Sequence, residues 1–257
     1  MMKICAASVS YRGTGRHELE YILEDAPKHG YEYLELQEFS RQMQQEKVDV
    51  SEILDEMTAL GLKASAVYGP GFGGVNAQQA QQSITDTRKM MEIAKAFDCD
   101  KVVSTGRGGK PDNGTPYIIE VMNTIAEDAQ ANNIKICLEP HYRNIIETFE
   151  DYQAIFAEVT NPNIGICLDT GHFYMSGVDT IKLIHTFPKR IFHAHIKDHI
   201  GHKSVAYGKG EVDNKSVINA LEEIGYQGFL SVELEVEDKQ NVSRYMGEAK
   251  KYFEELK

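Results

Sequence analysis

Short apolar segments alternate with longer amphipathic segments along the whole 257-residue chain. The apolar segments have the length of buried strands, and strands are expected at residues 3–8, 32–37, 62–68, 100–105, 134–139, 164–169, 190–196 and 228–234. Amphipathic helices are expected between and after them, at residues 16–28, 49–60, 78–97, 115–132, 149–159, 178–186, 214–224 and 241–255. The pattern is therefore strand then helix, repeated eight times.

Strict alternation of strand and helix predicts an α/β fold with a parallel sheet. Several predicted strands begin shortly after Gly30, Gly61 or Asn133, residues suited to the left-handed conformation that ends a helix. Eight units in about 250 residues favour a (β/α)8 TIM barrel. No linker or change of composition divides residues 1–257, so one domain is expected. An open doubly wound sheet is the alternative, although no GxGxxG motif follows the first predicted strand.

Four of the predicted strands in the second half of the chain end in a polar residue. These residues are Glu139 in KICLEPH, Asp169 in GICLDTGH, His195 in IFHAHIKD and Glu233 in LSVELEV. Side chains alternate across a strand, and in each case the bulky aliphatic residues fall on the face expected to meet the helices. The polar residue falls on the opposite face. We therefore expect the four side chains to point inward at the C-terminal mouth of the barrel.

Three carboxylates and one imidazole at one point predict a site for one divalent metal ion. A single carboxylate at a strand end is more often a solvated loop residue or a helix cap, but four inward groups in matching register would be costly without a cation. Mostly oxygen ligands with open positions suit Mn²⁺ best, with Mg²⁺, Co²⁺ and Zn²⁺ as alternatives. Such a metal polarises a carbonyl and stabilises an enediolate, and Glu139 and Glu233 are placed to act as acid and base.

Further polar residues near these strand ends are candidates for binding substrate. His172 follows Asp169 by three residues, where the loop after the sixth strand is expected to start. Lys197 shares a strand face with His195, so its ammonium group is placed to steady an anionic intermediate or a phosphate. His193 is expected in the barrel interior. Weaker candidates for hydroxyl or phosphate contacts are Arg143, His141 and Arg107.

The charge and composition of the chain weigh against nucleic-acid-binding and membrane-spanning proteins. The formal net charge of −12 opposes non-specific binding to nucleic acid, and no apolar run approaches the roughly 20 residues that span a bilayer. The N-terminus does not resemble a signal peptide, so a cytoplasmic protein with a small-molecule partner is expected. A homodimer stays open. The cysteines show no paired spacing and are expected to be buried thiols: Cys5, Cys99, Cys137 and Cys167.

Two glycine-rich segments, residues 69–74 and 106–109, follow the third and fourth predicted strands. Loops at that position lie on the catalytic face of a barrel, so a phosphate or hydroxyl cradle is one interpretation. Neither segment matches a P-loop, and a plain tight turn is favoured.

The motifs LEPHYRN, ICLDTGHF, HAHIKDH, YGKGE and LSVELE resemble those of the xylose isomerase-like TIM barrels, the sugar phosphate isomerase/epimerase superfamily. The resemblance covers the whole chain, with its specific motifs in residues 134–235. It implies that His172 contacts substrate and that Glu139 and Glu233 act as acid and base, as in the epimerases. It also implies that the metal ligands are Glu139, Asp169, His195 and Glu233.

The chain departs from two branches of that superfamily. Endonuclease IV-like members carry zinc-binding histidines where this chain has Tyr68 and Thr105, which weighs against an AP endonuclease. Ketose 3-epimerases carry a second substrate-binding glutamate where this chain has Arg143 and Asn144, and Glu147 comes slightly late.

The expected function is a metal-dependent isomerase or epimerase of a small sugar, a sugar phosphate or a polyol-derived ketone, a role in carbohydrate metabolism. A metal-dependent dehydratase acting on a related hydroxy-ketone is the main alternative. An AP endonuclease and a non-catalytic sugar-binding barrel are the remaining ones.

Overall fold

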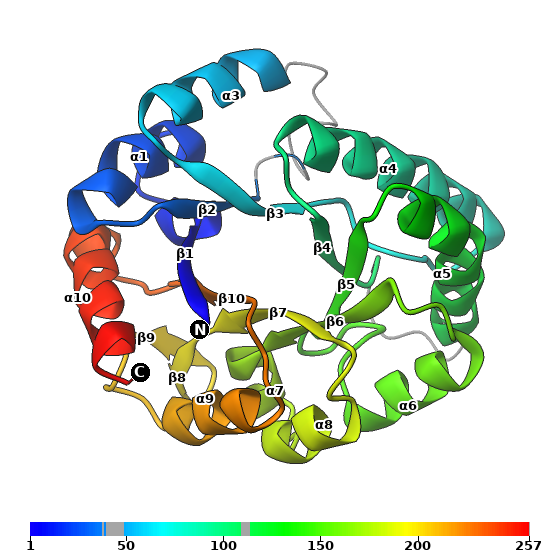
Figure 1. Cartoon of the computed structure of the whole chain (residues 1–257). Coiled ribbons are helices and arrows are strands. Elements are labelled where there is room, and N and C mark those ends of the chain that lie inside the picture. The colour runs from blue at the N-terminus through cyan, green and yellow to red at the C-terminus, as the bar shows by residue number, and fades with distance from the viewer. Residues whose placement is uncertain (38, 40–48, 109–113, 257) are drawn as a thin grey trace.

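The computed structural model describes residues 1–37, 39, 49–108 and 114–256. Eight parallel strands close into a barrel in the order β1-β10-β7-β6-β5-β4-β3-β2, with β1 paired to both β10 and β2 (Figure 1). The strands are β1 (Lys3–Ala7), β2 (Tyr33–Leu36), β3 (Lys63–Tyr68), β4 (Lys101–Thr105), β5 (Lys135–Glu139), β6 (Ile164–Asp169), β7 (Ile191–Ile196) and β10 (Phe229–Val232). The predicted (β/α)8 barrel is confirmed, and the doubly wound alternative is wrong.

Helices surround the barrel, as Figure 1 shows. They are α1 (Glu18–Asp25), α3 (Val50–Ala59), α4 (Ala77–Ala96), α5 (Gly114–Ala131), α6 (Phe149–Glu158), α7 (Thr170–Met175), α8 (Thr180–Thr186), α9 (Asn214–Glu223) and α10 (Val242–Glu255). Side chains cap several helix starts: Asp49, Asn76, Thr148, Asp179 and Asp213 each accept a backbone N–H bond from the first turn. Several helices therefore begin directly after a residue whose side chain accepts a hydrogen bond from a backbone N–H group that has no partner within the helix.

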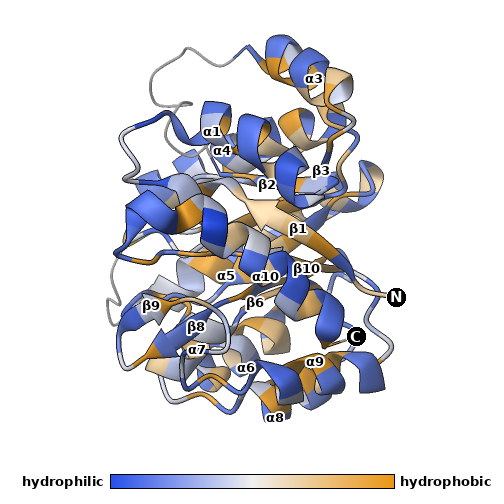
Figure 2. Cartoon of the chain, turned by 90° about the vertical axis from the view of Figure 1, so that its left-hand side faces the viewer, coloured by the Kyte–Doolittle hydropathy of each residue, from blue (hydrophilic) through white to orange (hydrophobic). Residues whose placement is uncertain are grey.

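The core has two layers that follow the alternation of side chains along the strands. Ile136 and Leu138 belong to the large core between strands and helices, whereas Cys137 lies in a small inner cluster with Ala66, Val103 and Cys167. Figure 2 shows that helices such as α1 and α9 mix hydrophilic and hydrophobic residues, whereas β1 is largely hydrophobic. All four cysteines are buried and free, as predicted. The alternation also decides which side chains can reach the barrel mouth.

Two features of the barrel mouth differ from the prediction. His172 does not start a loop but lies in α7, whose N-cap Asp169 accepts a bond from the His172 N–H at 2.8 Å. A hairpin of β8 (Asp198–Ile200) and β9 (Lys203–Val205) follows β7 where no element was expected. Six helical residues and two three-residue strands are too short to produce a clear hydrophobic period.

The glycine-rich segments pair with each other. Phe72 N–H donates to Thr105 O at 2.8 Å, and Arg107 N–H donates to Phe72 O at 2.7 Å. A Cβ on Gly71 would lie 2.8 Å from Arg107 Cα, so this close approach of two loops requires glycine. These amide groups bond to carbonyl groups of the protein, which supports the tight-turn interpretation over a phosphate cradle. Positions 109–113 fall outside the described residues.

Within the described part of the chain, no helix combines the length and the apolar character needed to cross a membrane.

Candidate metal centre

The structure brings together the four polar residues singled out at the strand ends. One ligand atom from each of them lies within 4.8 Å of one from every other, and all four side chains are buried: Glu139, Asp169, His195 and Glu233. Strand register explains the convergence, since Asp169 is directly opposite His195 across β6 and β7. Glu139 ends β5, and Glu233 directly follows β10. The four residues therefore form one buried cluster at the mouth of the barrel.

Hydrogen bonds satisfy only part of this cluster. His195 Nδ1 lies 2.5 Å from Glu139 Oε1 and 3.0 Å from Glu233 Oε2. Asp169 Oδ1 accepts the His172 N–H bond. Among the described residues, however, Asp169 Oδ2 and Glu233 Oε2 accept no well-aligned hydrogen bond although both atoms are buried. Buried carboxylate oxygens without well-aligned hydrogen bonds are costly, and their free lone pairs suit a hard divalent cation.

Two carboxylates of this cluster, Asp169 and Glu233, have shifted pKa values. Burial raises the pKa of Asp169 above its ordinary value, and the nearby Lys197 only partly opposes this effect. Burial also acts to raise the pKa of Glu233, but the positive charges of Lys197 and His195 outweigh it and hold that pKa well below its ordinary value. Repulsion from Glu233 adds to the effect of burial on Asp169, so the close approach of these carboxylates is unfavourable by itself. The cluster contains more negative charge than its own cations neutralise.

Lys197 and His172 border the cluster, as expected. The Lys197 ammonium is fully buried and lies 3.1 Å from Asp169 Oδ2 and 2.9 Å from Glu233 Oε1. It also contacts Glu235 Oε2 at 2.9 Å and His172 Nε2 at 3.5 Å. Burial, followed by the charge of Lys197, lowers the pKa of His172 well below its ordinary value, so its imidazole is neutral. A cation and a neutral imidazole thus face the same space as the carboxylates.

That space, the ligand cavity, has a volume of about 170 Å³. It is small and mostly polar, which suits a small hydroxylated molecule better than an apolar one. The residues lining it are Val9, Arg12, Gln37, Tyr68, Glu139, His141, His172, Lys197, Glu233 and Glu235. The His141 ring packs on His172 with 4.0 Å between ring centres, so this weaker candidate does reach the cavity.

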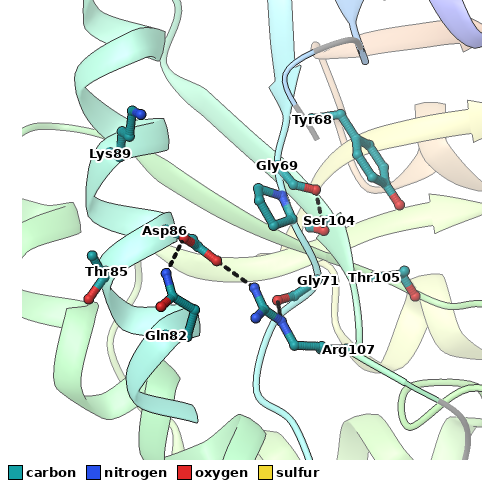
Figure 3. A pocket seen from close by; sticks show the side chains of 11 residues that line it. Tyr68, Gly69, Gly71, Gln82, Thr85, Asp86, Lys89, Ser104, Thr105 and Arg107 are labelled. Atoms are coloured by element: carbon teal, nitrogen blue, oxygen red, sulfur yellow. Dashed lines mark hydrogen bonds and ion pairs between the residues drawn. The ribbon is translucent and has the colours of Figure 1, made fainter. Parts of the chain in front are cut away.

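Neither predicted arginine lines the ligand cavity. Arg107 donates to Asp86 Oδ2 at 2.5 Å and to Gly71 O at 3.1 Å. It lines a separate cavity of about 770 Å³, the β3–β4 cavity, which Figure 3 shows between the strand ends and α4. Arg143 is exposed in a left-handed backbone conformation (φ 61°), and its guanidinium lies 5.0 Å from the centre of the Tyr142 ring.

The structure adds residues that the sequence did not single out. The Tyr68 hydroxyl donates a hydrogen bond to Glu139 Oε2. Arg12 pairs with Glu18 at 3.0 Å on the loop after β1, beside the cavity. Glu35 of β2 lies fully buried beneath the cluster. Its signal was available, because in EYLELQ it alternates with Leu34 and Leu36 and must therefore point into the barrel.

The chain is similar to several known proteins in sequence or in fold. The chain is 27% identical over 253 residues to a protein named inosose isomerase from Bacillus subtilis (strain 168), covering 91% of this chain and 89% of that protein. It is 30% identical over 155 residues to a protein named inosose dehydratase from Clostridium tetani (strain Massachusetts / E88), covering 52% of each. A crystal structure of IOLI protein with a binding zinc atom superposes with a TM-score of 0.84 and 24% identity, covering 99% of this chain and 98% of that one.

The profile of the xylose isomerase-like TIM barrels matches residues 23–256. That range contains seven of the eight barrel strands and all four residues of the buried cluster. The chain belongs to the xylose isomerase-like TIM barrel family.

Proposed function

We propose that this protein is a divalent-metal-dependent isomerase or epimerase of a small sugar, a sugar phosphate or a polyol-derived ketone. One observation carries the proposal: a buried cluster of three carboxylates and one imidazole borders a cavity of about 170 Å³. The relative named inosose isomerase, aligned over most of both chains, supports the class of reaction. Mn²⁺ is the first ion to test, followed by Mg²⁺, Co²⁺ and Zn²⁺.

The four clustered residues would hold the metal. When bound, the ion supplies a Lewis acid that polarises a substrate carbonyl. The residues fit it because Asp169 Oδ2 and Glu233 Oε2 are buried acceptors without aligned donors among the described residues. Lys197 keeps the Glu233 carboxylate ionised and leaves Asp169 in ion-pair contact.

Glu139 and Glu233 are proposed to transfer the proton at the carbon next to the carbonyl. They approach from β5 and from the end of β10, with β6 and β7 between those strands. A carboxylate on one side of the substrate removes the proton, and the carboxyl group on the other side returns one. The Tyr68 hydroxyl orients Glu139, and the Lys197 ammonium orients Glu233. Each acid/base candidate therefore has its own fixed partner.

The ligand cavity also provides contacts for substrate oxygens. His172 is neutral and buried, so its ring binds a hydroxyl without adding charge. Arg12 also lines the cavity, and its side chain is 35% exposed, so its guanidinium suits a substrate hydroxyl or phosphate. His141, packed on His172, extends the polar wall.

Dehydration of a related hydroxy-ketone is the second candidate function. It needs the same proton removal together with a donor that protonates the departing hydroxyl group. The buried Lys197 ammonium, which contacts three carboxylates and lies 3.5 Å from His172, is such a donor at the cavity. The relative named inosose dehydratase supports this candidate over half of each chain.

Product analysis in D₂O distinguishes the two reactions. The metal-loaded protein is incubated with a panel of free sugars, sugar phosphates and inososes, and products are identified by NMR and mass spectrometry. An isomerase or epimerase gives a product of unchanged composition with deuterium at a carbon that adjoins the carbonyl. A dehydratase gives a product lighter by one water. Binding without turnover, or cleavage of an abasic DNA duplex, would contradict the proposal.

A further inference from the structure

We propose that Glu35 is a positioning residue beneath the candidate metal centre, which holds His195 so that its Nδ1 atom faces the three carboxylates. This inference rests on the proposed metal site, but not on the identity of the substrate. Glu35 comes from β2, on the other half of the barrel from the strands that carry the four clustered residues.

The Glu35 carboxylate receives three side-chain partners inside the barrel. His195 Nε2 lies 2.8 Å from Glu35 Oε1 and 2.9 Å from Oε2. His193 Nε2 lies 2.9 Å from Glu35 Oε2, and the Ser231 hydroxyl donates to the same oxygen at 2.7 Å. Glu35, His193, His195 and Ser231 are all fully buried. These four residues therefore form a hydrogen-bonded network inside the barrel and not a surface contact.

This contact determines which nitrogen of His195 is available at the cluster. An imidazole that binds a metal ion is neutral, with its proton on one nitrogen and the metal-binding lone pair on the other. With the Nε2–H group bonded to Glu35, the lone pair lies on Nδ1, the atom that is 2.5 Å from Glu139 and 3.0 Å from Glu233. A carboxylate on the far side of a ligand imidazole fixes its orientation and makes it a stronger donor.

Charge supports the same role. The imidazoles of His193 and His195 lie 2.8–2.9 Å from the Glu35 carboxylate inside the barrel. Glu35 is thus a buried anion whose stabilising partners are these imidazoles. Lys197, which neutralises charge on the other side of the cluster, contacts Asp169, Glu233 and Glu235.

A second metal ion below the first is the competing interpretation. Cys5, Glu35 and His193 also offer ligand atoms within 4.8 Å of one another. Both Glu35 oxygens already accept hydrogen bonds, so an ion bound there would have to displace His195 or Ser231. We therefore assign Glu35 to positioning, and metal stoichiometry tests that choice.

The first measurement needs no variant. The full chain is labelled with ¹⁵N, loaded with diamagnetic Zn²⁺, and its histidine tautomers are read from the imidazole nitrogen shifts. We expect one Zn²⁺ per chain, with His195 protonated on Nε2 and zinc-bound through Nδ1. Zinc bound through Nε2, or two zinc ions per chain, would overturn the inference.

The second measurement compares Glu35→Gln with Ser231→Ala by competition against a fluorescent chelator. A glutamine has the shape of Glu35 but presents an NH₂ group to donors, so Zn²⁺ affinity is expected to fall about 10- to 100-fold. Ser231→Ala keeps the Glu35–His195 contact and is expected to lose less. Wild-type affinity in a folded Glu35→Gln protein would refute the inference. If Glu35→Gln does not fold, an unprotonated His195 Nε2 in the wild-type protein would do so. Metal binding without sugar turnover would defeat only the proposed function.

Discussion

Tyr68 lines two cavities that differ in the balance of charge around them. In the β3–β4 cavity, Arg107 and Asp86 form an ion pair at 2.5 Å, and Arg107 also bonds to Gly71 O (Figure 3). At the ligand cavity, Glu139 and Glu233 belong to the buried cluster of three carboxylates and one imidazole, and two of the cluster's carboxylate oxygens have no aligned donor among the described residues. The first cavity is the larger, at about 770 Å³ against about 170 Å³.

The comparison shows that charge balance identifies the candidate site better than volume does. An ion pair that lines a cavity neutralises its own two charges, so it needs no further counter-ion. A surplus of buried carboxylates is costly unless a bound cation neutralises its charge. If charge marks the functional cavity, substitutions in the ligand cavity should reduce activity, and substitutions in the β3–β4 cavity should not.

The largest effect is expected from Glu139→Gln in the ligand cavity. The substitution removes a charged ligand and an acid/base candidate, so kcat is expected to fall by about 10²–10⁴-fold. Metal content, measured by mass spectrometry on the purified protein, is expected to fall as well. The matched control is Asp86→Asn in the β3–β4 cavity, which should keep both. Equal losses in the two variants would end the distinction between the cavities.

Metal removal is the next test. A ligand that binds only the folded protein stabilises it by about 2.7 kcal/mol at a concentration 100 times its Kd. Chelation should therefore lower the Tm measured by calorimetry, and adding Mn²⁺ or Zn²⁺ should restore it. Glu139→Gln should show a much smaller response to added metal. A Tm that is the same with and without metal in the wild type would contradict a metal site.

The fold and the clustered residues could be predicted from sequence because both depend on local periodicity. Two-residue alternation placed Glu139 and Asp169 inward, and closure of the barrel brought them together. Arg107 follows the fourth strand and lies outside the ligand cavity, and the sequence could not reveal this because its partner Asp86 lies on α4. The helix that carries His172 was missed because it is six residues long.

The supporting residues were harder to predict because their partners are distant in the chain. Glu35 reaches His195 over 160 positions, and Tyr68 reaches Glu139 over 71. Alternation indicates that Glu35 points inward, but it cannot say which strand faces it across a closed barrel. The clustered residues come from strands 5 to 8 of the barrel, whereas these two partners come from strands 2 and 3. Pairing across a barrel is a property of its geometry.

Tyr68→Phe tests the boundary between the cavities. It removes one hydrogen bond to a charged carboxylate, an interaction of about 1.5–3 kcal/mol, so kcat is expected to fall about 10-fold or more. Metal content should not change, because Tyr68 is not one of the four clustered residues. Arg107→Ala, on the other side of the boundary, is the control and should leave kcat and KM unchanged. A rise in KM in that variant would show that substrate extends into the β3–β4 cavity.

The smallest expected effect is on the reactivity of the buried cysteines. Burial raises the pKa of Cys5 to about 12, and burial likewise raises the pKa of Cys99 to about 12. At pH 8 roughly one thiol in 10⁴ is then ionised, and only the thiolate reacts with disulfide reagents. The native protein should therefore show almost no reaction at pH 8, whereas the protein unfolded in guanidinium should titrate four thiols. Rapid reaction of Cys5 in the native state would mean that the network around Glu35 opens to solvent, since Cys5 lies beside Glu35 and His193. The His195 contact would then be too mobile to fix the imidazole, and the ligand cavity would lose the rigid base that sets it apart from its neighbour.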